Sequence, residues 1–570
     1  MIHYRVSLPN PHSHTLSVEL RIPAPAAQTS IHLPVWTPGS YLVREFSRYL
    51  SEATVEAVGG GRATIEKTAK GSWQISSDGA QEVIVRYTAY CHERSVRTPH
   101  VDGSHAFFTG TNLLCFVDGR TAEPHRLSVD LPQGWRIFTS RGLDVADFTV
   151  ADYDTLADLP VELGPNHLVA SVEILGKPHD LVFWGAEQTT INLPRLLDDT
   201  RALVEANAAM FGGSLPYERY LFIYHVSSDQ RGGLEHLDST VLATIWKNFE
   251  NEESYRDLLG LISHEHFHVW NVKRIRPRAL GPFNYLAENH TTGLWISEGA
   301  TSYFDNLNAL RAGRFTAQQW LKFLEQDLQR YFAIPGRFEQ SVALASFDAW
   351  TRLYRPDENT NNRTISYYLK GAMVSLALDL TIRDATAGER RFDDLLGLYW
   401  RRFCETGEAF DEGRVVEDLH TATGLDLSAQ VATWVYGTDD PPFAALLASH
   451  GVELRTTLPP GSHTGLDTTQ TSEGLRVTHV HSTGANAGGG IYPQDTLVAL
   501  AGRRVLADGT REWLAAQPAG TTMAVHLFRR DRLVETELRL GPPTGVTVTL
   551  EATATDDPAI LERRQRWLGL

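Results

Sequence analysis

One ten-residue segment constrains the local fold of this chain more than any other. It reads Leu-Ile-Ser-His-Glu-His-Phe-His-Val-Trp over 261–270, with histidines at every second position and one His-Glu-x-x-His pattern. In a strand, His264, His266 and His268 would share one face, because strand side chains alternate with period two. In a helix, His264 and His268 lie one turn apart while His266 points about 200° away from His264. Secondary structure therefore decides which histidines can bind the same metal ion.

The residues before the histidines favour the helix. Apolar residues at 255, 258, 259 and 262 follow helical spacing, and Ser254 with Asp257 three residues later is similar to a capping box. A helix over 254–270 puts His264 and His268 on one face, with Glu265 close enough to reach a water on a metal that the pair holds. We expect His266 to be packed, or to support a ligand, rather than to be a ligand.

A zinc hydrolase needs a third protein ligand and an open position for water. Two acids downstream compete for this role, Glu288 in Ala-Glu-Asn-His and Glu298 in Leu-Trp-Ile-Ser-Glu-Gly-Ala. Glu298 lies in an amphipathic helical segment, which fixes a carboxylate better than the Pro-, Asn- and Gly-containing stretch around Glu288. The residues alone favour Glu298 and leave Glu288 open.

Length and composition bound the partners of the chain. Its 570 residues suffice for about three or four domains. The formal net charge of −17 argues against nucleic acid or an anionic membrane as the main partner, since both select for clustered Lys and Arg. The three cysteines imply no disulfide framework, and neither a secretory leader nor an apolar run of about 18 residues is evident. We expect a cytoplasmic protein.

The periodicity of apolar residues changes along the chain and predicts a multidomain α+β protein. Short alternating segments up to about residue 165 predict an N-terminal β-sandwich, in which the Pro-, Gly- and aromatic-rich stretch 33–46 forms a structured loop of unknown purpose. Residues 166–450 read as an α-rich domain with a small sheet, 451–545 as a separate β module with one short helix near Thr510–Gln517, and 546–570 as a C-terminal tail. Helical patterns are expected over 194–211, 254–270, 295–311, 316–331, 366–384, 393–405 and 427–435.

Three further motifs make the pattern specific. Trp295-Ile296-Ser297-Glu298-Gly299 is similar to the W-x-x-E-G segment that supplies the glutamate ligand in gluzincin aminopeptidases. Gly232-Gly233-Leu234-Glu235-His236 resembles their G-x-x-E-N segment, an edge strand along the substrate whose glutamate grips the free α-amino group. Tyr368-Leu369-Lys370-Gly371 resembles their Y-x-K-G, whose tyrosine hydroxyl supports the tetrahedral intermediate; Tyr367 is the alternative.

The closest resemblance is to the glycyl aminopeptidase family, PDZ-bearing relatives of the thermolysin-like enzymes. It is carried by the segments 264–277, 232–240 and Trp-Thr-Pro-Gly-Ser-Tyr at 36–41. The gap from His268 to Glu298 exceeds that of typical monozinc aminopeptidases by about ten residues, an insertion that fits this family. The resemblance implies a thermolysin-like catalytic domain over 166–450 and a preference for small first residues, Gly or Ala.

The C-terminal module fits the same resemblance less closely. Glu473-Gly474-Leu475-Arg476-Val477 resembles a PDZ carboxylate-binding loop, and the segment 492–502 resembles the later G-D-x-I-x-x-I-x-G segment. Arg476 and Gln494 stand where glycines are common in PDZ domains. The module could therefore bind peptide C-termini or serve only in packing.

Together these observations predict a zinc aminopeptidase with one Zn²⁺ per chain. His264, His268 and Glu298 would hold the metal, Glu265 would act as general base, and Tyr368 would donate a hydrogen bond to the oxyanion. Gly232, Gly233 and Glu235 would bind the substrate, a peptide with a free N-terminus. The alternative is a zinc endopeptidase with the same metal site and PDZ-assisted substrate capture.

Overall fold

The computed structural model describes residues 1–505, 509–543 and 545–569, which form two compact units. The first unit contains Met1–Thr291, Phe304–Phe315 and Leu396–Glu412; the second contains Thr292–Tyr303, Thr316–Leu395 and Gly413–Leu570. The architecture confirms a multidomain mixed α and β protein with a β-rich N-terminal domain and a helical catalytic domain. No described helix is long and apolar enough to cross a membrane.

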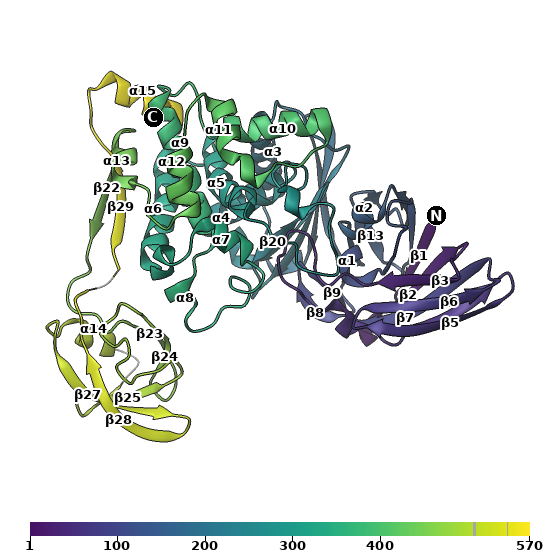
Figure 1. Cartoon of the computed structure of the whole chain (residues 1–570), viewed down its shortest axis with the longest axis horizontal. Helices are drawn as coiled ribbons and strands as arrows, with labels where there is room; N and C mark the ends of the chain where they lie inside the picture. The colour runs from purple at the N-terminus through teal and green to yellow at the C-terminus, as the bar shows by residue number, and fades with distance from the viewer. Residues whose placement is uncertain (506–508, 544, 570) are drawn as a thin grey trace. The chain divides into compact units, whose positions relative to one another are not determined.

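The N-terminal domain contains three sheets, where the sequence pattern predicts a sandwich (Figure 1). The first sheet has the order β15 (Asp147–Val150), β12 (His125–Asp130), β1 (Ile2–Ser7), β2 (Thr15–Pro23), β7 (Glu82–Tyr90) and β4 (Thr54–Val58). The second has β14 (Gly142–Leu143), β13 (Arg136–Thr139), β16 (Pro160–Gly164), β10 (Ala106–Thr109), β9 (Thr98–Val101) and β8 (His92–Ser95). The third has β11 (Phe116–Val117), β3 (Gln28–His32), β6 (Ser72–Asp78) and β5 (Arg62–Ala69).

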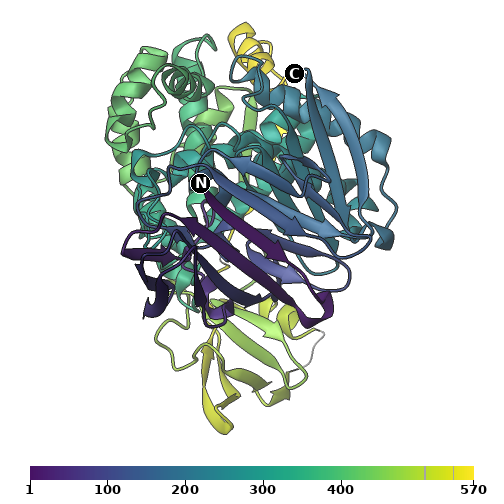
Figure 2. The same cartoon turned by 90° about the vertical axis from the view of Figure 1, so that its right-hand side faces the viewer.

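Alternation along these strands explains the domain. In β2 every second residue is buried, so one face of the strand faces the core and the other faces outward. One hydrophobic core contains residues of all three sheets, and Tyr285, from far along the chain, is part of it. The short helices α1 (Gly110–Leu113) and α2 (Tyr153–Ala157) complete the domain. Figure 2 shows its strands in purple to blue.

A mixed five-stranded sheet starts the catalytic domain. Its order is β17 (Leu168–Ile174), β18 (Lys177–Trp184), β19 (Tyr220–Ser227), β21 (Ser239–Ile245) and β20 (Gly232–Glu235). Every residue of β19 is buried, as expected for a central strand with parallel neighbours on both sides. A second hydrophobic cluster joins this sheet to Phe107 of β10 and Phe138 of β13. Strand β20 is antiparallel to β21 and forms the edge of the sheet.

The helices match the predicted segments closely. The bounds of the long and medium ones are α3 (Leu193–Ala209), α4 (Glu252–Phe267), the π-helical η6 (Trp295–Ala300), α5 (Thr301–Arg311), α6 (Ala317–Ala333), α7 (Val342–Phe347), α9 (Tyr367–Ala385), α10 (Asp393–Thr406), α11 (Val415–Thr423) and α13 (Phe443–Ala448). The short ones are α8 (Thr360–Arg363), α12 (Ser428–Gln430) and the π-helical η9 (Val431–Tyr436). In α9 most residues are buried around the whole helix, which is typical of a helix in the interior of a domain.

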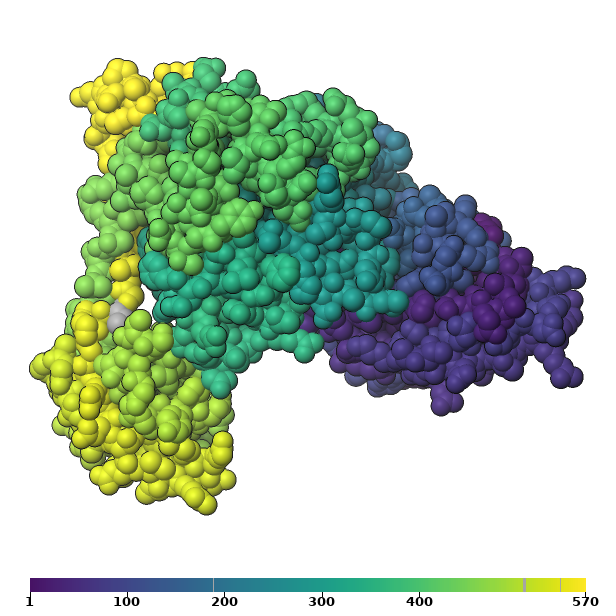
Figure 3. All heavy atoms as spheres, viewed as in Figure 1, coloured from purple at the N-terminus to yellow at the C-terminus, as the bar shows by residue number. Residues whose placement is uncertain are grey.

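The C-terminal strands form one sheet and one separate pair. The sheet has the order β23 (Leu466–Gln470), β24 (Leu475–Val480), β25 (Thr496–Leu500), β27 (Thr522–Arg529) and β28 (Arg532–Arg539), with β26 (Arg503–Arg504) on β25 and the helix α14 (Thr510–Ala515). Figure 3 shows this module in light green and yellow. The predicted short helix is confirmed, while the assignment as a PDZ domain is not established by this topology.

Residues 546–569 do not form a loose extension. Strand β29 (Thr547–Ala552) pairs with β22 (Val452–Thr457), and α15 (Pro558–Leu568) follows it. Trp567 of α15 is buried and packs edge-on against Trp320 of α6, with ring centroids 5.2 Å apart. The segment predicted as a tail therefore returns to the helices of its own unit.

Candidate functional site

The helix that carries the histidines is α4, and its existence confirms the helical prediction. It begins two residues earlier than predicted, because the side chain of Asn251 accepts the Ser254 backbone N–H at 2.8 Å and so caps the helix. The predicted capping box at Ser254 and Asp257 is thus wrong. Glu252 and Glu253 lie in the first turn, where the helix dipole favours negative charge.

The rings of His264 and of His268, which is the C-cap residue of α4, lie together. Their centroids are 4.8 Å apart and the planes are nearly perpendicular. In each ring, Nδ1 makes a hydrogen bond to a neighbouring residue. His264 Nδ1 lies 3.1 Å from a carboxylate oxygen of Asp305, and His268 Nδ1 donates to the carbonyl oxygen of Asn271 at 2.7 Å. Holding Nδ1 in this way orients Nε2 as the nitrogen that would ligate a metal.

His266 is packed on the other side of α4, as predicted. Its Nδ1 accepts a hydrogen bond from the Asn207 amide at 3.3 Å, and its Nε2 lies 2.8 Å from the Tyr217 hydroxyl. The ring is completely buried, and burial lowers the pKa of His266 well below its usual value. A neutral, doubly hydrogen-bonded His266 therefore supports the core beneath the helix.

A sharp turn follows α4 and brings Asn271 back to His268. Val272 has φ +130°, a backbone conformation that β-branched residues rarely adopt. The Arg274 guanidinium holds the turn by donating to three backbone carbonyls, those of Val269, Pro216 and Leu237, at 2.7, 2.7 and 3.1 Å. Arg274 in this motif thus has a structural explanation that its sequence position alone does not reveal.

Strand β20 brings the predicted substrate-binding residues beside α4. A Cβ added to Gly233 would lie 2.5 Å from Cγ of Glu265, so only glycine lets the Glu265 side chain lie against this strand. Glu235, Glu265 and His268 each offer one ligand-type atom, and these atoms all lie within 4.8 Å of one another. All three side chains are buried. The Gly-Gly-Leu-Glu motif therefore lies beside the His-Glu-x-x-His segment.

Glu235 is a buried carboxylate for which the described part of the chain supplies no cationic partner. It is 3% exposed, and its Oε1 has no hydrogen-bond partner among the described residues. Lys273, in the turn after α4, is 2.8 Å from Asp158, which also accepts the Leu237 backbone N–H. Burial alone would raise the pKa of Asp158, but the charge of Lys273 and the His236 hydrogen bond lower it to about 2. A buried anion without a cation is costly unless a ligand supplies one.

Glu298 and Gly299 lie in η6, a turn of π-helix, a type of distortion that often occurs at functional sites. The glycine explains the packing of this segment against α9. A Cβ on Gly299 would lie 2.5 Å from Cα of Gly371, and one on Gly371 would lie 2.8 Å from Cα of Gly299. The glycines of the W-x-x-E-G and Y-x-K-G motifs therefore permit one close helix crossing, which fixes Glu298 relative to the start of α9.

The two tyrosines at the start of α9 differ in exposure. Tyr367 is completely buried, whereas Tyr368 is half-buried and its hydroxyl lies 3.2 Å from that of Tyr354. Lys370 anchors the same turn by donating to the backbone carbonyls of Arg337 and Gln340, and burial lowers the pKa of Lys370 to about 8. The half-buried Tyr368 is the better placed of the two to meet a ligand.

The competing acid Glu288 lies in a very different environment. It is exposed in a segment without regular structure, and it belongs to none of the groups of close ligand-type side chains found among the described residues. Glu298 is 1% exposed. The environment of these two acids favours Glu298 as a fixed carboxylate.

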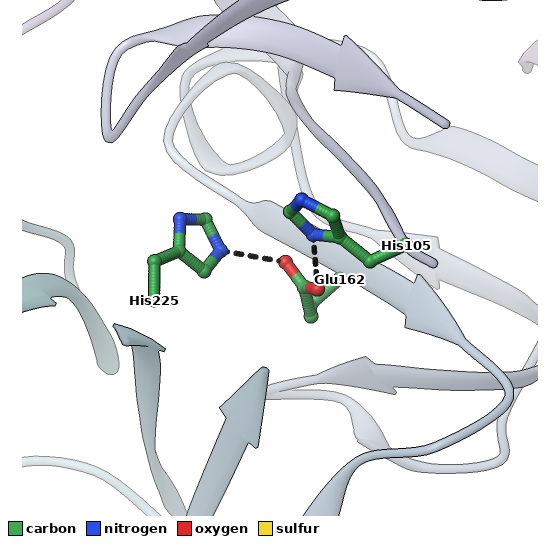
Figure 4. Close-up of side chains that lie close together, drawn as sticks. All are labelled: His105, Glu162 and His225. Carbon is green, nitrogen blue, oxygen red and sulfur yellow. Dashed lines mark hydrogen bonds and ion pairs between the residues drawn. The ribbon is translucent and has the colours of Figure 1, made fainter. Parts of the chain in front are cut away.

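A second group of histidines and a carboxylate lies in the first unit, apart from α4. Glu162 is completely buried and is surrounded by three imidazoles, two of which are drawn in Figure 4. His105 Nδ1 and His167 Nε2 lie 2.9 and 2.7 Å from its Oε1, and His225 Nε2 lies 2.9 Å from its Oε2. Trp184 stacks on His105 with ring centroids 4.0 Å apart. No sequence motif indicates this group, because its members are separated by up to 120 residues.

Comparison with known proteins gives two matches to family models. Residues 3–165 match the Peptidase M61 N-terminal domain, and residues 257–374 match the M61 glycyl aminopeptidase. The second match spans His264, Glu265, His268, Glu298 and Tyr368. No curated protein sequence matches the chain.

The chain is also similar to solved structures. An aminopeptidase N family protein from Idiomarina loihiensis is 28% identical, with 100% of each chain covered and a TM-score of 0.93. An M1 zinc metallopeptidase from Deinococcus radiodurans is 17% identical over 77% of this chain and 94% of that one, with a TM-score of 0.49. The first similarity extends over the whole chain, whereas the second is distant.

Proposed function

We propose that this chain, which carries both domains of the M61 glycyl aminopeptidase family, uses one zinc ion to remove small N-terminal residues, Gly or Ala, from peptides. The expected family and enzyme class are confirmed: the chain is a metallo-aminopeptidase. The observation that carries the proposal is the grouping of the buried Glu235 carboxylate with Glu265 and His268. The preference for small residues follows the similarity to the M61 glycyl aminopeptidase family.

The residues fit a metal. His264 and His268 present imidazoles one turn apart, and each has the outer hydrogen bond that metal-ligating histidines almost always make. We assign Glu298 as the third protein ligand, which would give the two-histidine, one-glutamate set of catalytic zinc sites. Zinc held there supplies Lewis acidity toward water and toward the scissile carbonyl.

Glu265 is assigned as the general base. Its neighbours on the helix are the two histidines, and Gly233 leaves room for its side chain against β20. It would take a proton from the attacking water and deliver one to the leaving amine. Tyr368 is assigned to donate a hydrogen bond to the oxyanion, where negative charge develops in the transition state.

Glu235 would determine which end of a peptide the enzyme cleaves. An α-ammonium supplies the cation that this buried carboxylate lacks, and an internal peptide group does not. Strand β20, at the edge of its sheet, offers backbone groups along which an extended substrate could lie. The charged contact would anchor the first residue, so that the first peptide bond lies at the catalytic groups.

A zinc endopeptidase is the second candidate, since it would use the same metal site. The C-terminal module would then capture substrate tails, as the resemblance of 473–477 to a PDZ carboxylate-binding loop suggests. Arg476 and Gln494 stand where PDZ domains commonly have glycine, and Gln494 has φ +72°. Glu235 Oε1, which has no hydrogen-bond partner in the described ranges, favours the aminopeptidase.

The decisive experiment compares Glu235→Gln with wild type on matched peptides with free and acetylated N-termini. Removing the charge should lower kcat/KM on the free amine by about 10–150-fold, equivalent to roughly 1.5–3 kcal/mol, while the metal stays bound. The loss on the acetylated peptide should be far smaller. An equal loss on both peptides, or efficient wild-type cleavage of the acetylated one, would favour the endopeptidase.

The ligand assignment is tested separately by metal analysis. Glu298→Gln should reduce metal content by well over tenfold, because an amide is a much poorer zinc ligand than a carboxylate. Glu288→Gln is the matched control and should retain the metal. The opposite result would make Glu288 the ligand.

A further inference from the structure

The segment 33–46 contains a tight turn whose conformation its sequence explains. Ser40 N–H donates to the Thr37 carbonyl at 3.0 Å, and between them lie Pro38 and Gly39. Gly39 has φ +91°, so Thr37–Ser40 fits a type II turn with proline and glycine at their preferred positions. The positive φ at position 39 favours glycine, as it does at Gly60.

Hydrogen bonds to both sides of the turn hold it in place. The indole N–H of Trp36 donates to the Asn284 carbonyl at 2.8 Å, and Val35 N–H donates to the Tyr285 carbonyl at 2.9 Å. The Arg44 guanidinium donates to the Ser40 hydroxyl at 2.8 Å. The turn is therefore fixed to the segment 284–285 of the catalytic region.

The tip of the turn touches the carboxylate of Glu235. A Cβ built on Gly39 would lie 2.7 Å from the carboxylate carbon of Glu235, a separation that real Cβ atoms essentially never show. Only a hydrogen atom fits between the turn and this carboxylate. A loop of the N-terminal domain thus forms one wall of the place where the substrate amine is proposed to bind.

We propose that Gly39 is a positioning residue that sets where the Glu235 carboxylate stands, and through it where the N-terminus of a peptide substrate is held. This inference rests on the proposed function of Glu235. A side chain at position 39 would push the carboxylate away from the turn. A displacement of about 1 Å in a substrate-positioning group can cost about 100-fold in rate.

The turn also borders a cavity of about 250 Å³, which offers a competing outcome. Trp36, Pro38, Gly39 and Tyr41 line it together with Asp154 and Arg276. A larger residue at position 39 could push the turn into this cavity instead of moving Glu235. The hydrogen bonds of Trp36 and Arg44 oppose that movement, so we expect the carboxylate to move.

The test is Gly39→Ala, with Gly60→Ala as the matched control. Gly60 has φ +106° in the same domain, and a Cβ added there would meet no neighbouring atom within 4 Å, so its substitution measures backbone strain alone. Gly39→Ala should lower kcat/KM for a free-amine peptide by roughly 10–100-fold. Gly60→Ala should leave it unchanged. Both variants should retain the metal content of wild type.

A second substitution distinguishes displacement of Glu235 from general damage. Glu235→Asp shortens the side chain by one methylene and makes room for a Cβ at position 39. In that background Gly39→Ala should cost less than about threefold, so that the two substitutions are strongly non-additive. If Gly39→Ala does not fold alone, the comparison of the double variant with Glu235→Asp decides. Additive losses, or a wild-type rate for Gly39→Ala, would overturn the inference.

The result also separates this inference from the proposed function. Suppose that Glu235→Gln loses free-amine selectivity but Gly39→Ala does not. Then only the positioning role of Gly39 is wrong, and the proposed role of Glu235 stands. If Glu235→Gln keeps that selectivity, the role of Glu235 is wrong and that of Gly39 is overturned with it.

Discussion

The group around His268 and the group around Glu162 contain the same residue types, yet their hydrogen bonds differ in direction. At α4, Asp305 and the Asn271 carbonyl hold the outer nitrogens of His264 and His268. Around Glu162 the imidazoles direct their inner nitrogens at the carboxylate. Their outer nitrogens, His105 Nε2, His167 Nδ1 and His225 Nδ1, have no hydrogen-bond partner among the described residues.

This difference in hydrogen bonding separates imidazoles that can ligate a metal from imidazoles that donate to a carboxylate. A metal-binding imidazole ligates with one nitrogen and donates the N–H of the other, so it needs an outer acceptor. A neutral imidazole that donates to a buried carboxylate leaves an outer lone pair, which tolerates the lack of a partner better than an N–H does. Burial lowers the pKa of His105 to about 4, so this ring is neutral near pH 7. We therefore interpret the Glu162 group as structural.

The largest expected difference is in metal content. His264→Ala and His268→Ala should each lose zinc affinity by more than the 10–100-fold that loss of an outer partner alone costs. His105→Ala and His225→Ala should retain it, as should His266→Ala. Metal analysis of the purified variants measures this. Loss of metal from the His105 or His225 variant would contradict the structural interpretation of the Glu162 group.

The next effect separates catalysis from coordination within the α4 group. Glu265→Gln should keep zinc and lose about 10²–10⁴-fold in kcat, because the amide cannot accept the proton of the attacking water. Kinetics and metal analysis on the same preparation test it. A variant without metal would show that Glu265 coordinates.

The Glu162 group should respond in stability instead. Glu162→Gln removes the charge that accepts three imidazole hydrogen bonds, each worth about 1.5–3 kcal/mol to a charged acceptor, and the amide recovers part of this. We expect a net loss of about 2–4 kcal/mol, seen as a lower Tm, with metal content unchanged. Wild-type stability together with lost metal would reverse the assignment of the two groups.

The shared helix of His264, Glu265 and His268 could be predicted from the sequence, whereas the group around Glu162 could not, and the reason is chain separation. His264, Glu265 and His268 lie within a span of five residues, so helical periodicity alone brings them together. The Glu235 carboxylate and Gly39 are almost 200 residues apart, and only the folded sheet and turn place them in contact. The segment 33–46 could be identified as an unusual loop, but its purpose depends on that contact.

Local errors also have physical causes. The start of α4 moves to Glu252 because Asn251 is itself a strong N-cap residue that precedes Ser254. The π-helical winding of Trp295–Ala300 has no periodicity signal, since six residues are too few to distinguish it from an α-helix. Predicting these features would require knowledge of the tertiary contacts.

The smallest expected effect tests the principle behind the comparison. Asp305 accepts from His264 through a 3.1 Å hydrogen bond, although it lies 41 residues away and no motif includes it. Asp305→Asn keeps the shape but removes the negative charge that orients the ring and raises its basicity as a ligand. Zinc affinity should fall by about 10–100-fold, less than in His264→Ala.

Competition with a chelator at fixed pH measures the zinc affinity. The control is a second histidine–aspartate pair, His100 with Asp102. His100 Nε2 lies 3.2 Å from an Asp102 carboxylate oxygen, a similar pair in the N-terminal domain that we assign no role in metal binding. Asp102→Asn should leave zinc affinity unchanged. If Asp305→Asn also leaves it unchanged, outer hydrogen bonds do not distinguish the two groups. The assignment of the Glu162 group would then rest on the metal content of its own variants.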